Sequence, residues 1–161
     1  MLTSIADVVD IVEPVAKFTD ALKAKPGVGM IFNTGLEDWN LSAEYTYDLV
    51  WAQWCLGHLT SVQLVTFLRK CAEALSEEGY IIVKENLTSI GSDIFHNEDN
   101  SVTRYVTWRM RMYFLIHCRC DENFRDLFRE AGLKLVKTEL QNGLPKVLFK
   151  VRMYALQPVK Q

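Results

Sequence analysis

The stretch Tyr47–Leu59, YDLVWAQWCLGHL, decides the fold of this 161-residue chain. Its first part, Tyr47–Trp51, is mostly apolar and predicts a buried strand, and a helix is expected to begin near Thr60. Open α/β sheets bind their ligands beyond the carboxyl ends of their parallel strands. The sequence therefore predicts a binding site in the loop between the strand and the helix. The polar and aromatic residues of this loop include Gln53, Trp54 and His58.

Strands and helices alternate through the rest of the chain. Helices are expected at 15–25, 61–75 and 122–131, with a turn at 76–79. Strands are expected at 7–12, 29–34, 47–51, 80–85, 133–141 and 148–156. This order predicts a single α/β domain over residues 1–161 with a mostly parallel sheet.

Composition and charge describe an ordinary folded protein. Apolar residues make up 49% of the chain, charged residues make up 24%, and the formal net charge is −2. This balance gives no reason to expect binding to nucleic acid or to an anionic membrane. No CxxC pair occurs among the four cysteines, which favours reduced intracellular thiols and gives poor evidence for a metal site. These cysteines are Cys55, Cys71, Cys118 and Cys120.

Four motifs together resemble the alpha-N-terminal protein methyltransferases, class I enzymes that use S-adenosyl-L-methionine. They are QWxxGHL from Gln53, VKEN ending at Asn86, SVTR at Ser101–Arg104, and the terminal GLP…VRMYAL. The resemblance implies a Rossmann-like, mostly parallel sheet with an antiparallel final strand. It also implies methyl transfer to exposed protein N-termini of the X-Pro-Lys type, in the cytoplasm and, as a second compartment, the nucleus.

On this resemblance, the cofactor-binding residues lie at or just after the carboxyl ends of three strands. They are Asp10, Ile11, Val12, Leu36, Glu37 and Gln53. The Asp10 carboxylate would accept hydrogen bonds from the two ribose hydroxyls, and neighbouring Glu13 stays open as the ribose ligand. A simpler alternative is that Asp10 and Glu13 are acidic residues favoured near a helix start by the helix dipole. Leu36 and Glu37 would flank the adenine.

The resemblance also assigns the peptide side of the site. The substrate-binding residues would be Trp54, Asn86, Asp99 and Ser101. An α-amino group has a pKa of about 8 in water and must lose a proton before it attacks a methyl group. Asp99 and His58 are the candidates to accept that proton, and Asn86 would bind the peptide backbone. We therefore expect Asp99, His58 and Asn86 to act in catalysis.

The chain departs from the family pattern at two places. The sequence contains no glycine-rich turn after a strand, so we expect the family's first strand and its GxGxG turn to be missing. We expect such an incomplete chain to have little or no activity. Residues 105–120 form an atypical insert, which we interpret as a retained intron rather than a basic docking surface. Two other functions stay open: a catalytically dead binding module for Pro-Lys N-termini, and a class I methyltransferase with another substrate.

We predict that the full-length transcript of this locus adds a strand with a GxGxG turn before Met1 and lacks codons 105–120. The physical reason is that removal of a central strand exposes two sheet edges, which are templates for aggregation. Sequencing the transcript and the genomic DNA around these codons measures both changes. A transcript that encodes the chain as printed would instead favour a binding or vestigial role.

Overall fold

The computed structural model describes residues 4–40, 45–88, 104–106, 113–115, 120–145 and 148–160. The chain forms two compact units, Met1–Leu41 and Ser42–Gln161. Each unit is described by itself below. That both belong to one domain stays a prediction.

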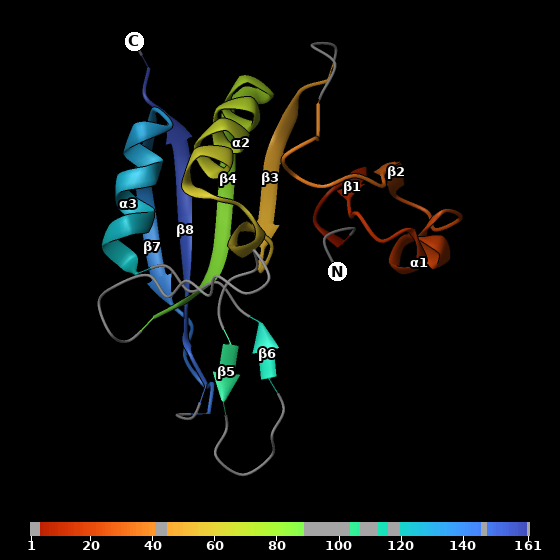
Figure 1. The fold of residues 1–161 in the computed structure, drawn as a ribbon. Coiled ribbons are helices and arrows are strands. Elements are labelled where there is room, and N and C mark those ends of the chain that lie inside the picture. The colour runs from red at the N-terminus through yellow and green to blue at the C-terminus, as the bar shows by residue number, and fades with distance from the viewer. Residues whose placement is uncertain are drawn as a thin grey trace. The chain divides into compact units, whose positions relative to one another are not determined.

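The first unit contains a pair of parallel strands with a short helical connection (Figure 1). β1 spans Val9–Val12 and β2 spans Val28–Phe32. Between them lie the short helix α1, Ala16–Thr19, and the 3₁₀ helix η2, Asp20–Leu22.

The helix predicted at 15–25 is therefore wrong in its length. Among the residues of α1 and η2, only Thr19 is buried, so no apolar face supports a longer helix. The Thr19 hydroxyl also donates to the Ala16 carbonyl oxygen at 2.9 Å. Local side-chain bonds of this kind compete with regular helical hydrogen bonding.

The second unit is built on a four-stranded sheet in the order β3-β4-β8-β7. Its strands are β3 (Tyr47–Gln53), β4 (Leu75–Leu87), β7 (Leu133–Leu140) and β8 (Lys150–Pro158). β3 pairs with β4 in parallel, and β8 is antiparallel to both β4 and β7. Three strands thus run in one direction and the last strand runs against them. The expected antiparallel final strand is confirmed.

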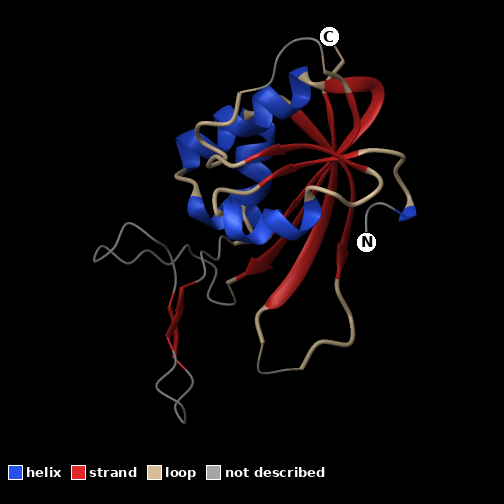
Figure 2. Ribbon diagram, turned by 90° about the vertical axis from the view of Figure 1, so that its right-hand side faces the viewer, coloured by secondary structure: helices blue, strands red, loops and turns tan. Residues whose placement is uncertain are grey.

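Two helices cover one face of this sheet. α2, Ser61–Glu73, and α3, Asp121–Glu130, lie on the same side of the strands (Figures 1 and 2). α2 begins with a capping box, in which the Thr60 hydroxyl accepts a hydrogen bond from the Gln63 N–H at 3.3 Å and Gln63 Oε1 accepts one from the Thr60 N–H at 2.9 Å. The expected helix start near Thr60 is confirmed. The core between helices and sheet includes Leu64, Leu68, Ile81, Val83, Phe124, Phe128, Tyr154 and Leu156.

The turn predicted at 76–79 is wrong, because these residues lie within β4. Tyr47 pairs with Leu75 and Leu49 pairs with Tyr80, so the strand register shifts between the two pairs. A Cβ atom on Gly79 would lie 3.0 Å from the Tyr47 carbonyl oxygen. The close approach of the two backbones favours glycine at this bulge.

A second strand pair lies almost entirely within the expected insert at 105–120. β5, Arg104–Val106, and β6, Tyr113–Leu115, pair in antiparallel fashion. The rest of the insert, except Cys120, falls outside the described residues. The interpretation of the segment as an insert stays a prediction.

A buried tyrosine links α3 to the sheet. Tyr154 packs against two phenylalanine rings of α3, and its hydroxyl donates to Asp121 Oδ1 at 2.8 Å. Arg125 donates to the other carboxylate oxygen of Asp121 at 3.1 Å. Partial burial by itself would raise the pKa of Asp121. The hydrogen bonds from Tyr154 and Arg125, with the charges of Arg125 and Arg152, outweigh burial and lower that pKa.

We predict that Tyr154→Phe lowers the free energy of unfolding at neutral pH by about 1–2 kcal/mol, because a hydrogen bond to a charged group is lost. A carboxyl group with a lowered pKa stabilises the fold fully above the unfolded-state pKa, and this stabilisation is lost as the pH falls through the folded-state pKa. The difference between variant and wild type should therefore shrink below about pH 4. Urea denaturation at several pH values measures it.

The control for this prediction is Tyr80→Phe, because Tyr80 is an exposed tyrosine of the same sheet. We expect it to leave stability nearly unchanged. An effect of Tyr154→Phe that is equal at neutral and acid pH would contradict a bond to the charged form of Asp121.

Candidate functional site

The candidate site lies where the parallel strand β3 ends. Gln53 is the last residue of β3, and the 3₁₀ helix η3, Leu56–His58, follows after two residues. The first of these, Trp54, has a φ angle of 53° and is the only described non-glycine residue with positive φ. Its side chain is 52% exposed. The loop thus presents a large aromatic ring from a strained backbone position, and such positions are frequent at functional sites.

The neighbouring strand β4 holds this loop through two consecutive residues. The Lys84 carbonyl oxygen accepts a hydrogen bond from the Trp54 N–H at 3.1 Å, and the Lys84 ammonium lies 5.2 Å from the centroid of the Trp54 ring. Glu85 Oε1 accepts hydrogen bonds from the N–H groups of Cys55 and Leu56, both at 2.9 Å. The Glu85 side chain is buried, with 2% exposure. Backbone and ring of the loop are therefore both held by β4.

The cofactor candidate Gln53 and the predicted peptide-side residues Asn86 and His58 lie around the same loop. Gln53 is half-buried, and its Oε1 accepts a hydrogen bond from Trp51 Nε1 at 3.2 Å. Asn86 is half-buried two residues beyond Lys84, so both side chains lie on the same face of β4. His58 is exposed at the end of η3. The structure thus brings Gln53, Trp54, His58 and Asn86 to one end of the second unit.

Two predicted residues cannot be placed in this arrangement. Asp99 and Ser101 lie outside the described residues, so their roles in catalysis and peptide binding stay predictions. His58 remains the described candidate for accepting the proton.

The first unit contains the predicted ribose ligand. Asp10 lies within β1, as the expected strand at 7–12 implies, and its Oδ1 accepts a hydrogen bond from the Met30 N–H at 2.7 Å. The strand register shifts between Val9 and Ile11, which leaves a bulge at this point. A Cβ atom on Gly29 would lie 2.2 Å from Asp10 Oδ1, so glycine makes room for the carboxylate.

The remaining cofactor candidates lie beside Asp10 or after β2. Ile11 and Val12 are half-buried residues of β1. Glu13 follows them, and its Oε1 accepts a hydrogen bond from the Val15 N–H at 2.9 Å, next to the start of α1. This bond supports the alternative that Glu13 serves the helix start. Leu36 is half-buried and Glu37 is exposed.

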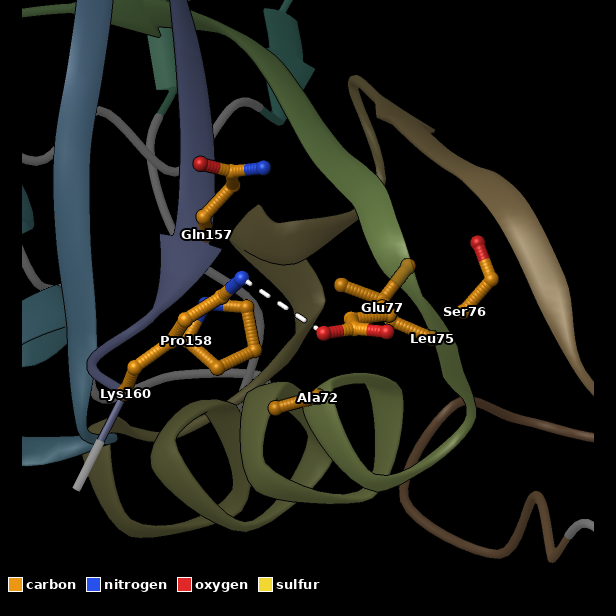
Figure 3. Close-up of a pocket in the computed structure, with 7 residues that line it drawn as sticks. All are labelled: Ala72, Leu75, Ser76, Glu77, Gln157, Pro158 and Lys160. Atoms are coloured by element: carbon orange, nitrogen blue, oxygen red, sulfur yellow. Dashed lines mark ion pairs between the residues drawn. The ribbon is translucent and has the colours of Figure 1, made fainter.

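A small pocket lies near the other end of β4 (Figure 3). Its volume is about 210 Å³, less than most ligand pockets. Leu75 and Ser76, at the start of β4, line it, and the Lys160 ammonium lies 3.9 Å from the Glu77 carboxylate beside it. Because the pocket is small and remote from the Trp54 loop along β4, we assign it no part in the candidate site.

Metal and thiol chemistry have little support in the part of the chain that the structure describes. No group of three or more His, Cys, Asp or Glu residues there is placed to hold a metal ion. Burial, with a smaller effect of neighbouring Cys55, raises the pKa of the Cys71 thiol far above its usual range and makes that thiol unreactive at neutral pH. None of the described helices is long and apolar enough to cross a membrane.

Glu85 is the main site residue that the sequence analysis missed. The VKEN motif pointed to Asn86, and the acidic residue before it received no role. One signal could have identified it. Glu85 alternates with Ile81 and Val83 along an apolar strand, so its carboxylate falls on the buried face and must find hydrogen-bond donors there.

The chain matches the model of a protein family described as AdoMet dependent proline di-methyltransferase, over residues 1–114 and 115–157. It is 39% identical over 160 residues to alpha N-terminal protein methyltransferase 1 of Schizosaccharomyces pombe, which covers 98% of this chain and 65% of that protein. It is 30% identical to N-terminal Xaa-Pro-Lys N-methyltransferase 1-B of Xenopus laevis, again over 98% of this chain and 65% of that protein. It is 38% identical to alpha N-terminal protein methyltransferase 1 of Arabidopsis thaliana, over 92% of this chain and 50% of that protein. The chain thus spans about half to two thirds of these relatives.

Solved structures agree with the predicted fold. A SAM-dependent methyltransferase of Leishmania major is 30% identical, with a TM-score of 0.81 over 98% of this chain and 58% of that chain. The DhpI protein in complex with SAH has a TM-score of 0.67 at 14% identity, over 99% of this chain and 70% of that chain, which supports the fold alone. The predicted class I methyltransferase fold is confirmed.

We predict that Trp54→Gly is more stable than Trp54→Ala by about 1 kcal/mol, because only glycine adopts a positive φ angle without strain. Both variants remove the same ring, so the comparison isolates the backbone. The free energy of unfolding in urea measures the difference. The matched pair Trp51→Gly and Trp51→Ala, within β3, should show the reverse order, because glycine weakens a strand interior. Equal stabilities of the two Trp54 variants would contradict backbone strain in the loop.

Proposed function

Because the chain belongs to the family of AdoMet-dependent proline dimethyltransferases, we propose that it methylates exposed α-amino groups of proteins. The methyl donor would be S-adenosyl-L-methionine, as the family description implies. The observation that supports this best is the Trp54 loop with Asn86, at an end of parallel strands where open α/β sheets bind ligands.

The proposed substrate is an extended N-terminal peptide of the Xaa-Pro-Lys type, which the name of the Xenopus relative states for that protein. The exposed Trp54 ring offers a flat apolar surface on which a proline ring can pack. Asn86 carries a side-chain amide, which can both donate and accept hydrogen bonds with an extended peptide backbone. Together the two side chains would orient the first residues of the substrate.

The residues of this chain would also prepare the amine for attack. In-line displacement at a methyl group depends mainly on positioning, because the two reacting atoms must be aligned at short distance. The α-amine attacks only after it has lost its proton, and His58 or Asp99 would accept that proton. His58 is suited to this because a neutral imidazole has a ring nitrogen that can accept a proton.

The chemistry of the candidate cofactor residues fits S-adenosyl-L-methionine, which supplies an activated methyl group when bound. Asp10 Oδ1 accepts a hydrogen bond from the Met30 N–H, and a carboxylate is the chemical group that can accept hydrogen bonds from two neighbouring ribose hydroxyls. Ile11 and Val12 would lie beside the ribose, Leu36 and Glu37 beside the adenine, and Gln53 beside the methionine part.

We place the proposed activity in the cytoplasm, with the nucleus as a second compartment. In the part of the chain that the structure describes, Cys55, Cys71 and Cys120 form no disulfide, which supports a reducing compartment.

The proposed function predicts methylation of an Ala-Pro-Lys peptide, in contrast to the little or no activity expected from a missing GxGxG turn, and no methylation of the same peptide when its N-terminus is acetylated. The reason is that acetylation removes the nucleophilic amine. Mass spectrometry after incubation with S-adenosyl-L-methionine measures the added methyl groups. Trp54→Ala should weaken peptide binding about tenfold, because the contact proposed between the Trp54 ring and the substrate proline is lost. Tyr80→Ala, which removes an exposed aromatic residue elsewhere on β4, should leave peptide binding unchanged.

The outcomes of this experiment separate the open functions. Measurable turnover would overturn the inactivity expected from the sequence. Peptide binding without turnover would favour the binding module for Pro-Lys N-termini. Methylation of small amines, with no binding of the peptide, would favour a class I methyltransferase with another substrate.

A further inference from the structure

We propose that Lys84 and Glu85 of β4 are positioning residues, which fix Trp54 in the orientation that the peptide needs. This inference rests on the proposed function, in which the Trp54 ring contacts the substrate. Neither residue would touch the reacting atoms. Each would act through the Trp54 loop, Glu85 on its backbone and Lys84 on its ring.

Glu85 holds the loop from the buried side of the sheet. It alternates along β4 with Ile81 and Val83, which are both fully buried, so its carboxylate lies on the face covered by helices. Its Oε1 accepts hydrogen bonds from the N–H groups of Cys55 and Leu56. A buried carboxyl group is costly unless hydrogen-bond donors lie beside it, and these two amides are such donors. The same bonds fix the chain direction immediately after Trp54.

Lys84 holds the loop from the opposite side. Its carbonyl oxygen accepts the Trp54 N–H, and its ammonium lies over the Trp54 ring at 5.2 Å from the centroid. The ring is 52% exposed, so packing against the core restrains it little. A cation over an indole face favours one orientation of the ring, and a flexible lysine stem can reach it along the sheet.

The two restraints together explain why Trp54 can keep its left-handed backbone. A non-glycine residue keeps a φ angle of 53° only where its surroundings determine it. Here three consecutive N–H groups, beginning with that of Trp54, donate hydrogen bonds to two consecutive residues of β4. Loss of either restraint should let the ring sample other orientations, and the peptide would then have to order it on binding.

Fluorine NMR of the chain labelled with 5-fluorotryptophan tests this directly. Trp54→Phe assigns the Trp54 resonance among the four tryptophans. Lys84→Met and Glu85→Gln should each shift or broaden that resonance. Lys84→Arg should restore it, because arginine keeps a cation for the ring. Glu78→Gln, the same chemical change at an exposed position of β4, is the matched control and should leave it unchanged.

Peptide kinetics give the second readout. We expect Lys84→Met to raise the KM for an Ala-Pro-Lys peptide about tenfold, with little change in kcat or in cofactor binding, and Lys84→Arg to recover most of the loss. If turnover is too slow to measure, the peptide Kd replaces KM. Should Glu85→Gln fail to fold, the Lys84 pair of variants still decides.

A Trp54 resonance that is unchanged in Lys84→Met and in folded Glu85→Gln would overturn the inference. So would a shifted resonance with unchanged peptide binding, because the pair would then have no role in recognition. A wild-type chain that binds no peptide would instead overturn the proposed function. The resonance would in that case still show whether the pair holds the ring.

Discussion

The hydrogen bonds between the Glu85 carboxylate and the first amides after Trp54 connect the core of the second unit to its candidate site. A carboxyl group with 2% exposure needs donors close by, and the backbone N–H groups of Cys55 and Leu56 are two such donors. Leu56 is itself fully buried, so the loop is anchored by apolar packing at the same point. The conformation of the Trp54 loop therefore depends on the correct placement of β4, and the site cannot rearrange independently of the sheet.

The placement of β4 depends in turn on its two neighbours and on the helices. β3 fixes it on one side in parallel register, and β8 fixes it on the other in antiparallel register. The capping box at Thr60 starts α2 directly after the loop, so the loop is held at both ends. On the same face of the sheet, the bond from Tyr154 to Asp121 joins β8 to the start of α3. The candidate site thus rests on a continuous path of packing through the second unit.

Sequence patterns among neighbouring residues predicted most of these elements. Features that depend on contacts between residues far apart in the sequence were not predicted. The start of α2 at Thr60 and the end of α3 before Gly132, whose φ angle is 78°, depend on neighbouring residues and were predicted correctly. The bulge at 76–79 depends on register with β3, which no local pattern contains. The role of Glu85 was missed because the backbone N–H groups that donate hydrogen bonds to it lie 29 and 30 residues earlier in the chain.

The two units differ in how much core supports their candidate residues. Among the described residues of the first unit, only Thr19 and Trp39 are buried, and its strands form a single pair held in part by the bond from Met30 to Asp10. A lone strand pair has little stability in water by itself. The peptide-side residues Trp54 and Asn86, with the cofactor candidate Gln53, belong instead to the second unit, whose four-stranded sheet packs under two helices. Peptide binding by the second unit could therefore persist under conditions where the strand pair of the first unit is not ordered. This is the physical reason that a binding module stays the main alternative to an enzyme.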